Sequence, residues 1–195
     1  MSLSMGEPKE IRMIVFSALL TALNEVMGRD GKNSVLRFAG LEKYINQDIP
    51  PSLEESISFK TFRALIDSMN DLLGHGTDAI LYESGRKFAI YLTPFGFSLK
   101  EVAEKLSNWI GGTWIVLEDN NKGVVQIKNN PVCKGLVSDR PSCHVISGAL
   151  AKIKEESTGK RYLVKEISCE SKGDSCCEFH ILQQKKPDEV DDYGP

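Results

Sequence analysis

The chain has 195 residues, of which 41% are hydrophobic and 26% are charged, and its formal net charge is -3. This composition excludes a disordered chain, and no apolar run approaches the roughly 18 to 20 residues that a bilayer span requires. Because 24 basic residues face 27 acidic ones, the chain lacks the broad positive field used in non-specific nucleic-acid binding. We therefore expect a soluble globular protein without a membrane span or a nucleic-acid partner.

The first predicted element is a long amphipathic helix between Pro8 and Met27, which ends at Gly28. Its apolar residues recur at helical spacing: Ile11, Val15, Leu19, Leu23, Val26 and Met27. A second apolar edge widens the apolar arc, which favours burial on two sides, against the chain's own core and against a partner subunit. The sequence therefore predicts an N-terminal helix over residues 1–29 that forms the contact of a homodimer.

Four further helices are predicted before residue 112, over residues 35–45, 59–73, 79–92 and about 98–110. Ser58 can cap the second of these helices and Gly74 closes it. The third segment is ambiguous between strand and helix, and we favour a helix in which Gly85 allows close packing. Ser98 and Glu101 form a capping box, which predicts the start of the fourth helix.

The periodicity changes after this point. Short β-branched runs at 113–118 and 124–128 predict a hairpin, and residues 162–168 and 176–182 predict another. Between them, Pro141 favours a helix start and Gly159 a helix end. The fold class is therefore α+β (mixed α/β), with N-terminal helices followed by a ββαββ antiparallel-sheet half. We expect one ligand-binding domain over residues 30–183 and a polar tail over residues 184–195.

The cysteines are unevenly placed, since all five lie in the last third of the chain: Cys133, Cys143, Cys169, Cys176 and Cys177. No secretory signal is visible in the first ten residues, so we expect a reducing compartment, the cytoplasm, where such a cluster is more often a metal site than a disulfide framework. Residues that flank one tight turn are neighbours, because strands lie about 4.8 Å apart. Three thiolates and a carboxylate would give zinc a closed tetrahedral shell. Buried free thiols are the alternative.

The pattern around these cysteines is more specific than their number. It reads Asn130-Pro131-x-x-x-Gly135, Pro141-x-Cys143-x-x-x-x-Gly148 and Val164-x-Glu166-x-x-Cys169-x-x-x-Gly173-x-x-x-Cys177-x-Phe179. Across residues 130–181 it resembles the 4-vinyl reductase domain. The segments Gly40-Leu41, Leu72-Leu73-Gly74 and Leu81-Tyr82-x-x-Gly85 look like the N-terminal half of that family. The resemblance implies an α/β domain, similar in fold to the vesicle-tethering TRAPP subunits, that dimerises and encloses an apolar pocket.

The same resemblance implies a ligand set for zinc, since related domains that sense aromatic hydrocarbons hold zinc with three cysteines and a glutamate. Transferred to this chain, the ligands are Cys143, Glu166, Cys169 and Cys177. Cys133 and Cys176 are then bystander thiols. Among the three histidines, His75, His144 and His180, only His144 lies beside a proposed ligand; it is either an alternative donor to the metal or a solvent-facing neighbour.

A pocket for an apolar molecule is usually lined by aromatic residues. The candidates lie in one stretch of the chain: Phe88, Phe95, Phe97, Trp109 and Trp114. Each of them is equally explained as an ordinary core residue. Motifs for catalysis, phosphate binding or dinucleotide binding are absent from the sequence, so the residues favour a protein that is not an enzyme.

Three interpretations follow from the sequence. The first is a zinc-containing, homodimeric sensory domain that binds a hydrophobic or aromatic small molecule, such as a hydrocarbon, and in which zinc has no catalytic role. The second is a reductase, or an accessory protein, that acts on vinyl tetrapyrroles. The third is a dimeric assembly scaffold, in which the first helix and not a pocket is the functional element. We favour the first.

Overall fold

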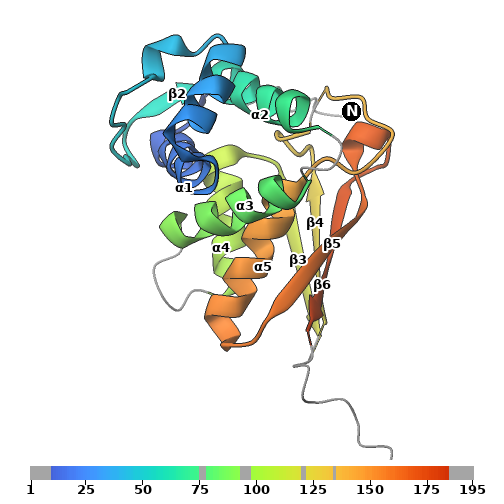
Figure 1. Cartoon of the computed structure of the whole chain (residues 1–195). Helices are drawn as coiled ribbons and strands as arrows, with labels where there is room; N and C mark the ends of the chain where they lie inside the picture. Colours follow the sequence, from blue (N-terminus) through green and yellow to red (C-terminus); the bar gives the residue numbers. More distant parts are fainter. Residues whose placement is uncertain (1–9, 75–77, 93–97, 120–121, 134, 185–195) are drawn as a thin grey trace, which may run out of the picture.

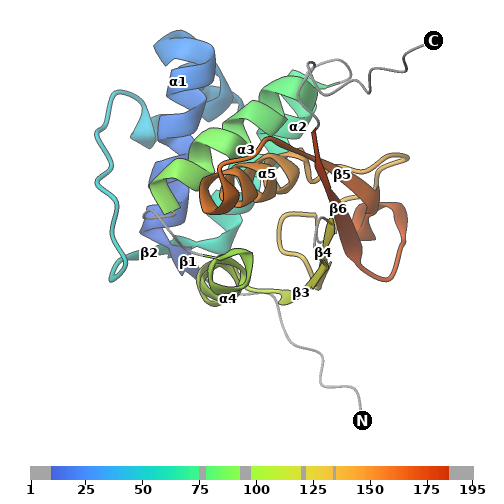
Figure 2. The same ribbon diagram turned by 90° about the horizontal axis from the view of Figure 1, so that it is seen from below.

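The computed structural model describes residues 10–74, 78–92, 98–119, 122–133 and 135–184. A four-stranded antiparallel sheet forms one layer, and helices cover one of its faces (Figures 1 and 2). The helices α4 (Leu99–Ile110) and α5 (His144–Thr158) lie nearest the sheet. Behind them, α3 (Asp78–Leu92) packs on α5, and α1 (Met13–Phe38) packs on α3. This arrangement confirms the predicted α+β class with its helical first half.

The sheet contains both predicted hairpins. Its strands are β3 (Thr113–Asp119), β4 (Lys122–Lys128), β5 (Tyr162–Ser168) and β6 (Cys177–Gln183), in the order β3-β4-β6-β5. The side chains that face α4 and α5 are apolar and buried, among them Val125, Ile127, Phe179 and Ile181. In the register of β4 and β6, Ile127 lies opposite Cys177. The sheet therefore brings the end of β4 to the start of β6, where the cysteines gather.

The N-terminal helix differs from its prediction at both ends. Residues Glu10–Arg12 form the short strand β1, which pairs with β2 (Ser56–Ser58), and α1 begins only at Met13. Gly28 leaves the helical conformation (φ 73°, ψ 173°), but the chain resumes its helix and continues to Phe38. The predicted helix over 35–45 therefore ends early, and a 3₁₀ turn, Glu42–Tyr44, follows it. The predicted boundary between residues 29 and 30 falls within α1 and stays a prediction.

The wide apolar arc of α1 is buried inside its own chain. The residues of both apolar edges are at most 6% exposed: Val15, Phe16, Leu19, Leu20 and Leu23. They pack against α2 (Phe59–Leu73), α3 and the 3₁₀ turn, where Phe16 makes an edge-on ring contact with Tyr44 at 5.0 Å. Burial within the chain therefore explains the width of the arc without a partner subunit.

The other helix predictions are confirmed to within a few residues. The Ser58 hydroxyl accepts a hydrogen bond from the Thr61 amide and caps α2, while Ser98 and Glu101 form the capping box of α4. The segment that was ambiguous between strand and helix is the helix α3. The last helix, α5, starts at His144, three residues after Pro141, since Cys143 occupies its N-cap position.

Two glycines explain why α3 and α5 approach so closely. A Cβ atom at Gly85 would lie 1.9 Å from the Val145 carbonyl oxygen, and one at Gly148 would lie 1.8 Å from the Tyr82 carbonyl oxygen. Each helix thus meets the other backbone to backbone through its glycine, which confirms the role predicted for Gly85. No helix within the described residues has the length and apolar character needed to cross a membrane.

Candidate metal centre

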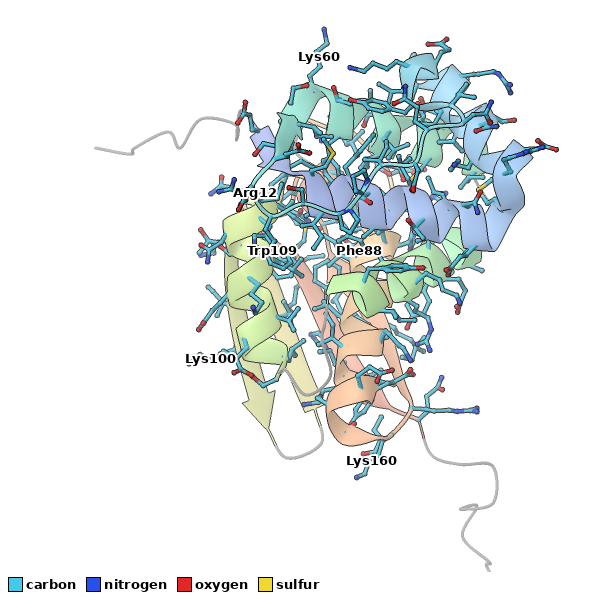
Figure 3. The ribbon with its side chains drawn as sticks, turned by 90° about the vertical axis from the view of Figure 1, so that its left-hand side faces the viewer. Arg12, Lys60, Phe88, Lys100, Trp109 and Lys160 are labelled. Atoms are coloured by element: carbon cyan, nitrogen blue, oxygen red, sulfur yellow. The ribbon has the colours of Figure 1, made fainter. Side chains whose placement is uncertain are left out.

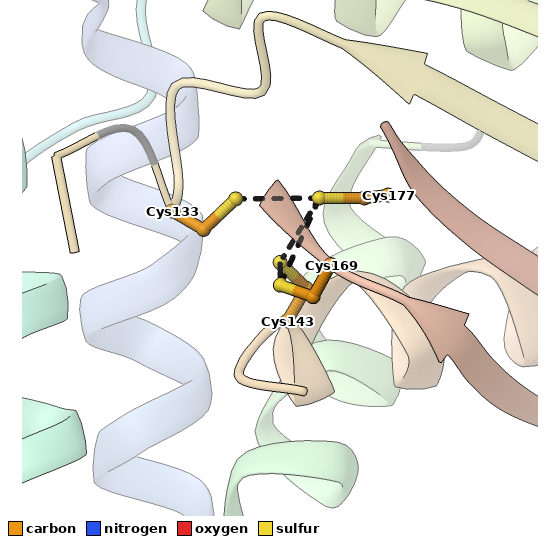
Figure 4. A group of neighbouring side chains, drawn as sticks. All are labelled: Cys133, Cys143, Cys169 and Cys177. Carbon is orange, nitrogen blue, oxygen red and sulfur yellow. Dashed lines mark hydrogen bonds between the residues drawn. The ribbon is translucent and has the colours of Figure 1, made fainter. Parts of the chain in front are cut away.

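Four cysteine side chains from separate segments meet at one end of the sheet. Cys133 lies in the turn after β4, Cys143 at the start of α5, Cys169 just after β5, and Cys177 at the start of β6. Their Sγ atoms all lie within 4.8 Å of one another (Figure 4). Each side chain is at most 1% exposed, and all five cysteines of the chain are free. We refer to these four residues as the cysteine cluster.

The spacing of the sulfur atoms fits one tetrahedral metal ion. Zinc bound to four sulfurs at about 2.3 Å places those sulfurs about 3.8 Å apart. The Sγ of Cys143 lies 3.8 Å from that of Cys169 and 3.9 Å from that of Cys177, while Cys169 and Cys177 are separated by 3.9 Å. Cys133 approaches Cys177 more closely, at 3.3 Å. Four buried thiols at these distances can hold a metal ion.

The surroundings of the cluster supply hydrogen-bond donors that favour thiolates. The side-chain amide of Asn130 donates to Cys143 Sγ and to Cys177 Sγ, at 3.3 Å in each case. The backbone N–H of Glu170 also donates to Cys177 Sγ at 3.4 Å. Asn130 is fully buried, so its amide has no water as an alternative partner. Donors of this kind stabilise and orient metal-bound thiolates.

The protonation of the cluster favours a bound cation as well. Hydrogen bonds from Cys133 and Cys143 lower the pKa of Cys169, and the same two contacts lower the pKa of Cys177. In turn, the contact with Cys133 raises the pKa of Cys143 well above its usual range. Without a cation the sulfurs therefore share protons, since four thiolates this close would repel one another. A divalent metal ion replaces those protons.

Glu166, predicted as a ligand, lies at the edge of the cysteine cluster. One carboxylate oxygen, Oε2, accepts a hydrogen bond from the Cys143 backbone N–H at 2.8 Å. The other, Oε1, is buried and has no hydrogen-bond partner. Burial first, and then contact with Cys169, raises the pKa of this carboxyl to about 9. Glu166 is thus a fifth potential donor, placed beside four sulfurs.

Cys133 departs from the sequence interpretation, which set it aside as a bystander thiol. It joins the cluster because the register of β4 and β6 carries the turn after β4 to the start of β6. That turn is further held by Arg63 of α2, whose guanidinium donates to the carbonyl oxygens of Pro131 and Val132 at 3.1 and 3.3 Å. The spacing of the cysteines gave no signal for this contact, which depends on strand register. Cys176, the other expected bystander, is not among the four.

His144 does not join the sulfur cluster. Its Nε2 lies 3.4 Å from Asp78 Oδ1, and burial lowers the pKa of its ring. His180 pairs with Glu178 at 2.7 Å on β6, and His75 lies outside the described residues. Asp78 thus holds the one histidine that the sequence considered as a donor.

A small apolar cavity lies next to the cluster, between the helices and the sheet. Its volume is about 30 Å³. Every lining side chain is apolar or aromatic: Val15, Leu19, Phe62, Ile66, Phe88, Leu106, Ile110, Trp114, Val132, Val145, Ile146, Ala149 and Leu150. Val132 directly precedes Cys133, and Val145 follows Cys143 by two residues. The cavity and the cysteine cluster therefore share two segments of backbone.

The predicted pocket aromatics divide into three groups. Phe88 and Trp114 line the cavity. Trp109 does not line it; this residue lies near the end of α4, where the Lys105 ammonium stands 5.9 Å from its ring, while Phe88 lies on α3 beneath α1 (Figure 3). Phe95 and Phe97 lie outside the described residues. The remaining walls are aliphatic, and their helical spacing in the sequence did not distinguish them from ordinary core.

Replacement of Asn130 by aspartate tests the role of its amide. The substitution keeps the shape of the side chain but turns the donor that faces Cys143 and Cys177 into an acceptor. We expect the affinity for zinc to fall by about 10- to 100-fold, measured by competition with a chelator. Asn129→Gly is the control, because Asn129 is exposed, has a positive φ of 54° and makes no contact with the sulfurs. Equal affinities for the two variants would contradict the role of Asn130.

The comparisons with known proteins confirm the resemblance seen in the sequence: residues 124–183 match the model of the 4-vinyl reductase domain. An uncharacterized protein of Methanocaldococcus jannaschii is 29% identical over 115 residues, which cover 55% of this chain and 46% of that protein. A second uncharacterized protein of the same organism is 26% identical over 141 residues, which cover 72% of this chain and 75% of that one. The chain thus spans about half the length of the first relative.

Solved structures of H-NOX domains share the fold. An oxygen-binding H-NOX domain related to soluble guanylate cyclases aligns with a TM-score of 0.56 and 18% identity, over 90% of this chain and 96% of that one. An H-NOX protein from S. oneidensis in its Fe(II)NO state aligns with a TM-score of 0.55 and 14% identity, over 90% and 100%. At these identities the likeness establishes the fold alone.

Proposed function

We propose that this protein, which carries a 4-vinyl reductase domain, is a sensory module without enzymatic activity that binds a small hydrophobic molecule and is stabilised by one zinc ion. The observation that supports it best is the pairing of two features on shared backbone. A wholly apolar cavity lies beside four buried cysteines whose spacing suits a tetrahedral ion. Binding sites for small molecules are typically apolar with few polar groups. Sensing is the role that joins such a cavity to a structural metal.

Zinc is the metal that this donor set favours. Four sulfur donors in a tetrahedral arrangement suit zinc or iron–sulfur chemistry, and separations near 3.8 Å suit a single ion. Cys143, Cys169 and Cys177 would hold it together with Cys133 or Glu166. When bound, zinc supplies a closed four-coordinate link between the turn after β4, the start of α5 and the β5–β6 hairpin. A filled shell leaves no open position for a substrate, which argues for a structural role.

The shared fold supports small-molecule sensing. The H-NOX structures are described as binding oxygen and as containing heme. For the present chain, however, a tetrapyrrole is disfavoured, because the cavity is only about 30 Å³ and none of its described lining residues is a histidine. This observation also argues against the reductase alternative. The homodimer and the cytoplasmic location stay part of the proposal; five free cysteines agree with a reducing compartment.

Calorimetric titration of the zinc-loaded protein with benzene tests the proposal. We expect saturable binding to the wild type, and a loss of at least about 10-fold in affinity for Ala149→Leu, since burying one added methylene already changes binding by about 1 kcal/mol. Ala149 lines the cavity. As the control, Ser157→Leu adds a leucine on the exposed last turn of the same helix. Equal affinity in all three proteins, or no binding to any, would reject an apolar sensor.

A further inference from the structure

The metal centre contains more donors than a tetrahedral ion can use. Four sulfurs lie within 4.8 Å of one another, and the Glu166 carboxylate lies beside them. Zinc in a structural site takes four ligands, so one of the five is always left out. Cys143, Cys169 and Cys177 have separations of 3.8 to 3.9 Å that suit one ion. The choice therefore falls between Cys133 and Glu166 for the fourth position.

Glu166 is held ready for this position. The Cys143 backbone N–H binds one of its oxygens, which fixes the carboxylate against the start of α5. Its second oxygen, Oε1, is buried without a hydrogen-bond partner. A buried acceptor of this kind is costly unless something satisfies it. A metal ion in the neighbouring cluster is the group that would do so, and no shift of the backbone of β5 is then required.

Cys133 is the member of the cluster best placed to leave it. It enters from the turn after β4, on the side away from Cys143 and Cys169, and its drawn contact is with Cys177 (Figure 4). The other three are fixed by the N-terminus of α5 and by the hairpin of β5 and β6. A turn moves at lower cost than a helix or a paired strand, because fewer backbone hydrogen bonds must break.

The same turn forms one wall of the apolar cavity. Val132, next to Cys133, is the one lining residue that belongs to a turn; the others lie in α1 to α5 or in β3. At about 30 Å³ the cavity holds no aromatic molecule, since a cavity that binds benzene measures about 150 Å³. A wall must therefore move before a ligand enters. Val132 is the part of the wall that can move, and Cys133 moves with it.

We propose that Cys133 and Glu166 are alternative fourth ligands of the metal, exchanged when a hydrophobic molecule displaces Val132 from the cavity wall. Cys133 leaves as Glu166 takes its place, so one metal–sulfur bond breaks and one metal–oxygen bond forms. The departing thiolate takes up the proton that the carboxyl gives up, and the charge of the centre is unchanged. The proposal rests on the proposed function, and it makes the metal centre the reporter of an occupied cavity.

Cobalt(II) in place of zinc makes the exchange visible, because its thiolate charge-transfer absorption increases with the number of bound sulfurs. We expect benzene to lower this absorption in the wild type by about a quarter, as four thiolates become three. Cys133→Ser should start at the lower level and show no change. Glu166→Gln should start at the full level and lose at least half of the response. An unchanged wild-type absorption at a benzene concentration that saturates binding by calorimetry would overturn the exchange.

Alkylation gives a second readout that does not depend on cobalt. With zinc bound, iodoacetamide followed by mass mapping should modify Cys133 at least about 5-fold faster with benzene than without, while Cys143, Cys169 and Cys177 stay protected. Equal protection of all four would overturn the exchange alone. A protein that binds neither cobalt nor benzene would overturn the proposed function together with the exchange. The two failures are thus distinguishable.

Discussion

Replacement of Cys177 by serine is expected to abolish metal binding, whereas the same replacement of its neighbour Cys176 should have no effect. The Cys177 sulfur contacts the other three sulfurs of the cluster at 3.3 to 3.9 Å. It also accepts hydrogen bonds from Asn130 and from the Glu170 backbone. Cys176 is buried to a similar degree but lies outside the cluster. The pair therefore separates the loss of a ligand from the general effect of a buried Cys→Ser change.

The loss of the metal should also lower stability. A ligand at about 1,000 times its dissociation constant stabilises the folded state by about 4 kcal/mol. For a chain of this size, 4 kcal/mol corresponds to a fall of about 8 to 16 °C in Tm. We expect Cys177→Ser to show this fall without chelator, and the wild type to show it after chelation. Elemental analysis should find about one zinc per chain in the wild type and in Cys176→Ser.

The outcome for Cys177→Ser has a clear contrary result. If this variant retains one metal ion per chain and the Tm of the wild type, the cysteine cluster is not a metal site. A wild type that contains iron instead of zinc would keep the site and correct the metal. If both cysteine variants lose stability equally while the metal stays bound, the sulfurs contribute through packing alone.

Local signals in the sequence predicted most of the elements, because each of those signals acts over a few residues. The capping box at Ser98 and Glu101 forms as predicted, since both hydrogen bonds lie within one helical turn. The same holds for the hairpins, whose turns and alternation are local. Gly28 misled the prediction, because a positive φ is usual at a helix end and here interrupts a helix that resumes. Sequence alone does not reveal whether a helix resumes after such a break.

The cysteine cluster was predicted less completely, for a physical reason. Cys143, Cys169 and Cys177 flank one hairpin and one helix start, so spacing and topology place them together. Cys133 reaches the cluster through the pairing of β4 with β6, which are far apart in the sequence. Register between such strands depends on the packing of the whole sheet. The apolar cavity was hidden for the same reason, as most of its walls are aliphatic residues from five helices.

The crossing of α3 and α5 links the helical half to the metal centre. Gly148 lies on α5, just over one turn after Cys143, and faces the backbone of α3 at Tyr82. The Tyr82 hydroxyl in turn accepts a hydrogen bond from the Val164 amide of β5 at 3.3 Å. A change in the separation of the two helices would thus move the first ligand of the cluster and the strand that precedes Cys169.

Gly148→Ala is therefore expected to destabilise the protein by about 3 kcal/mol or more, at the upper end of the cost of overpacking a core. Its Cβ would lie 1.8 Å from the Tyr82 oxygen, 2.8 Å from the Tyr82 carbonyl carbon and 3.1 Å from the Arg86 nitrogen. All three atoms belong to the backbone of α3, so no side-chain rotation relieves the clash. Helix propensity opposes this result, since alanine in a helix is favoured over glycine by about 1 kcal/mol.

Denaturant unfolding of three variants separates the clash from other effects. Gly85→Ala, which places a Cβ 1.9 Å from the Val145 oxygen, should cost as much as Gly148→Ala. Ser147→Ala changes the neighbouring buried position on α5, where the hydroxyl has no hydrogen-bond partner, and should be neutral or stabilising. We also expect Gly148→Ala to bind zinc more weakly, because α5 carries Cys143. If Gly148→Ala is instead more stable than the wild type, as propensity alone predicts, then α3 and α5 do not meet through their backbones, and Cys143 is positioned by the hairpin without their help.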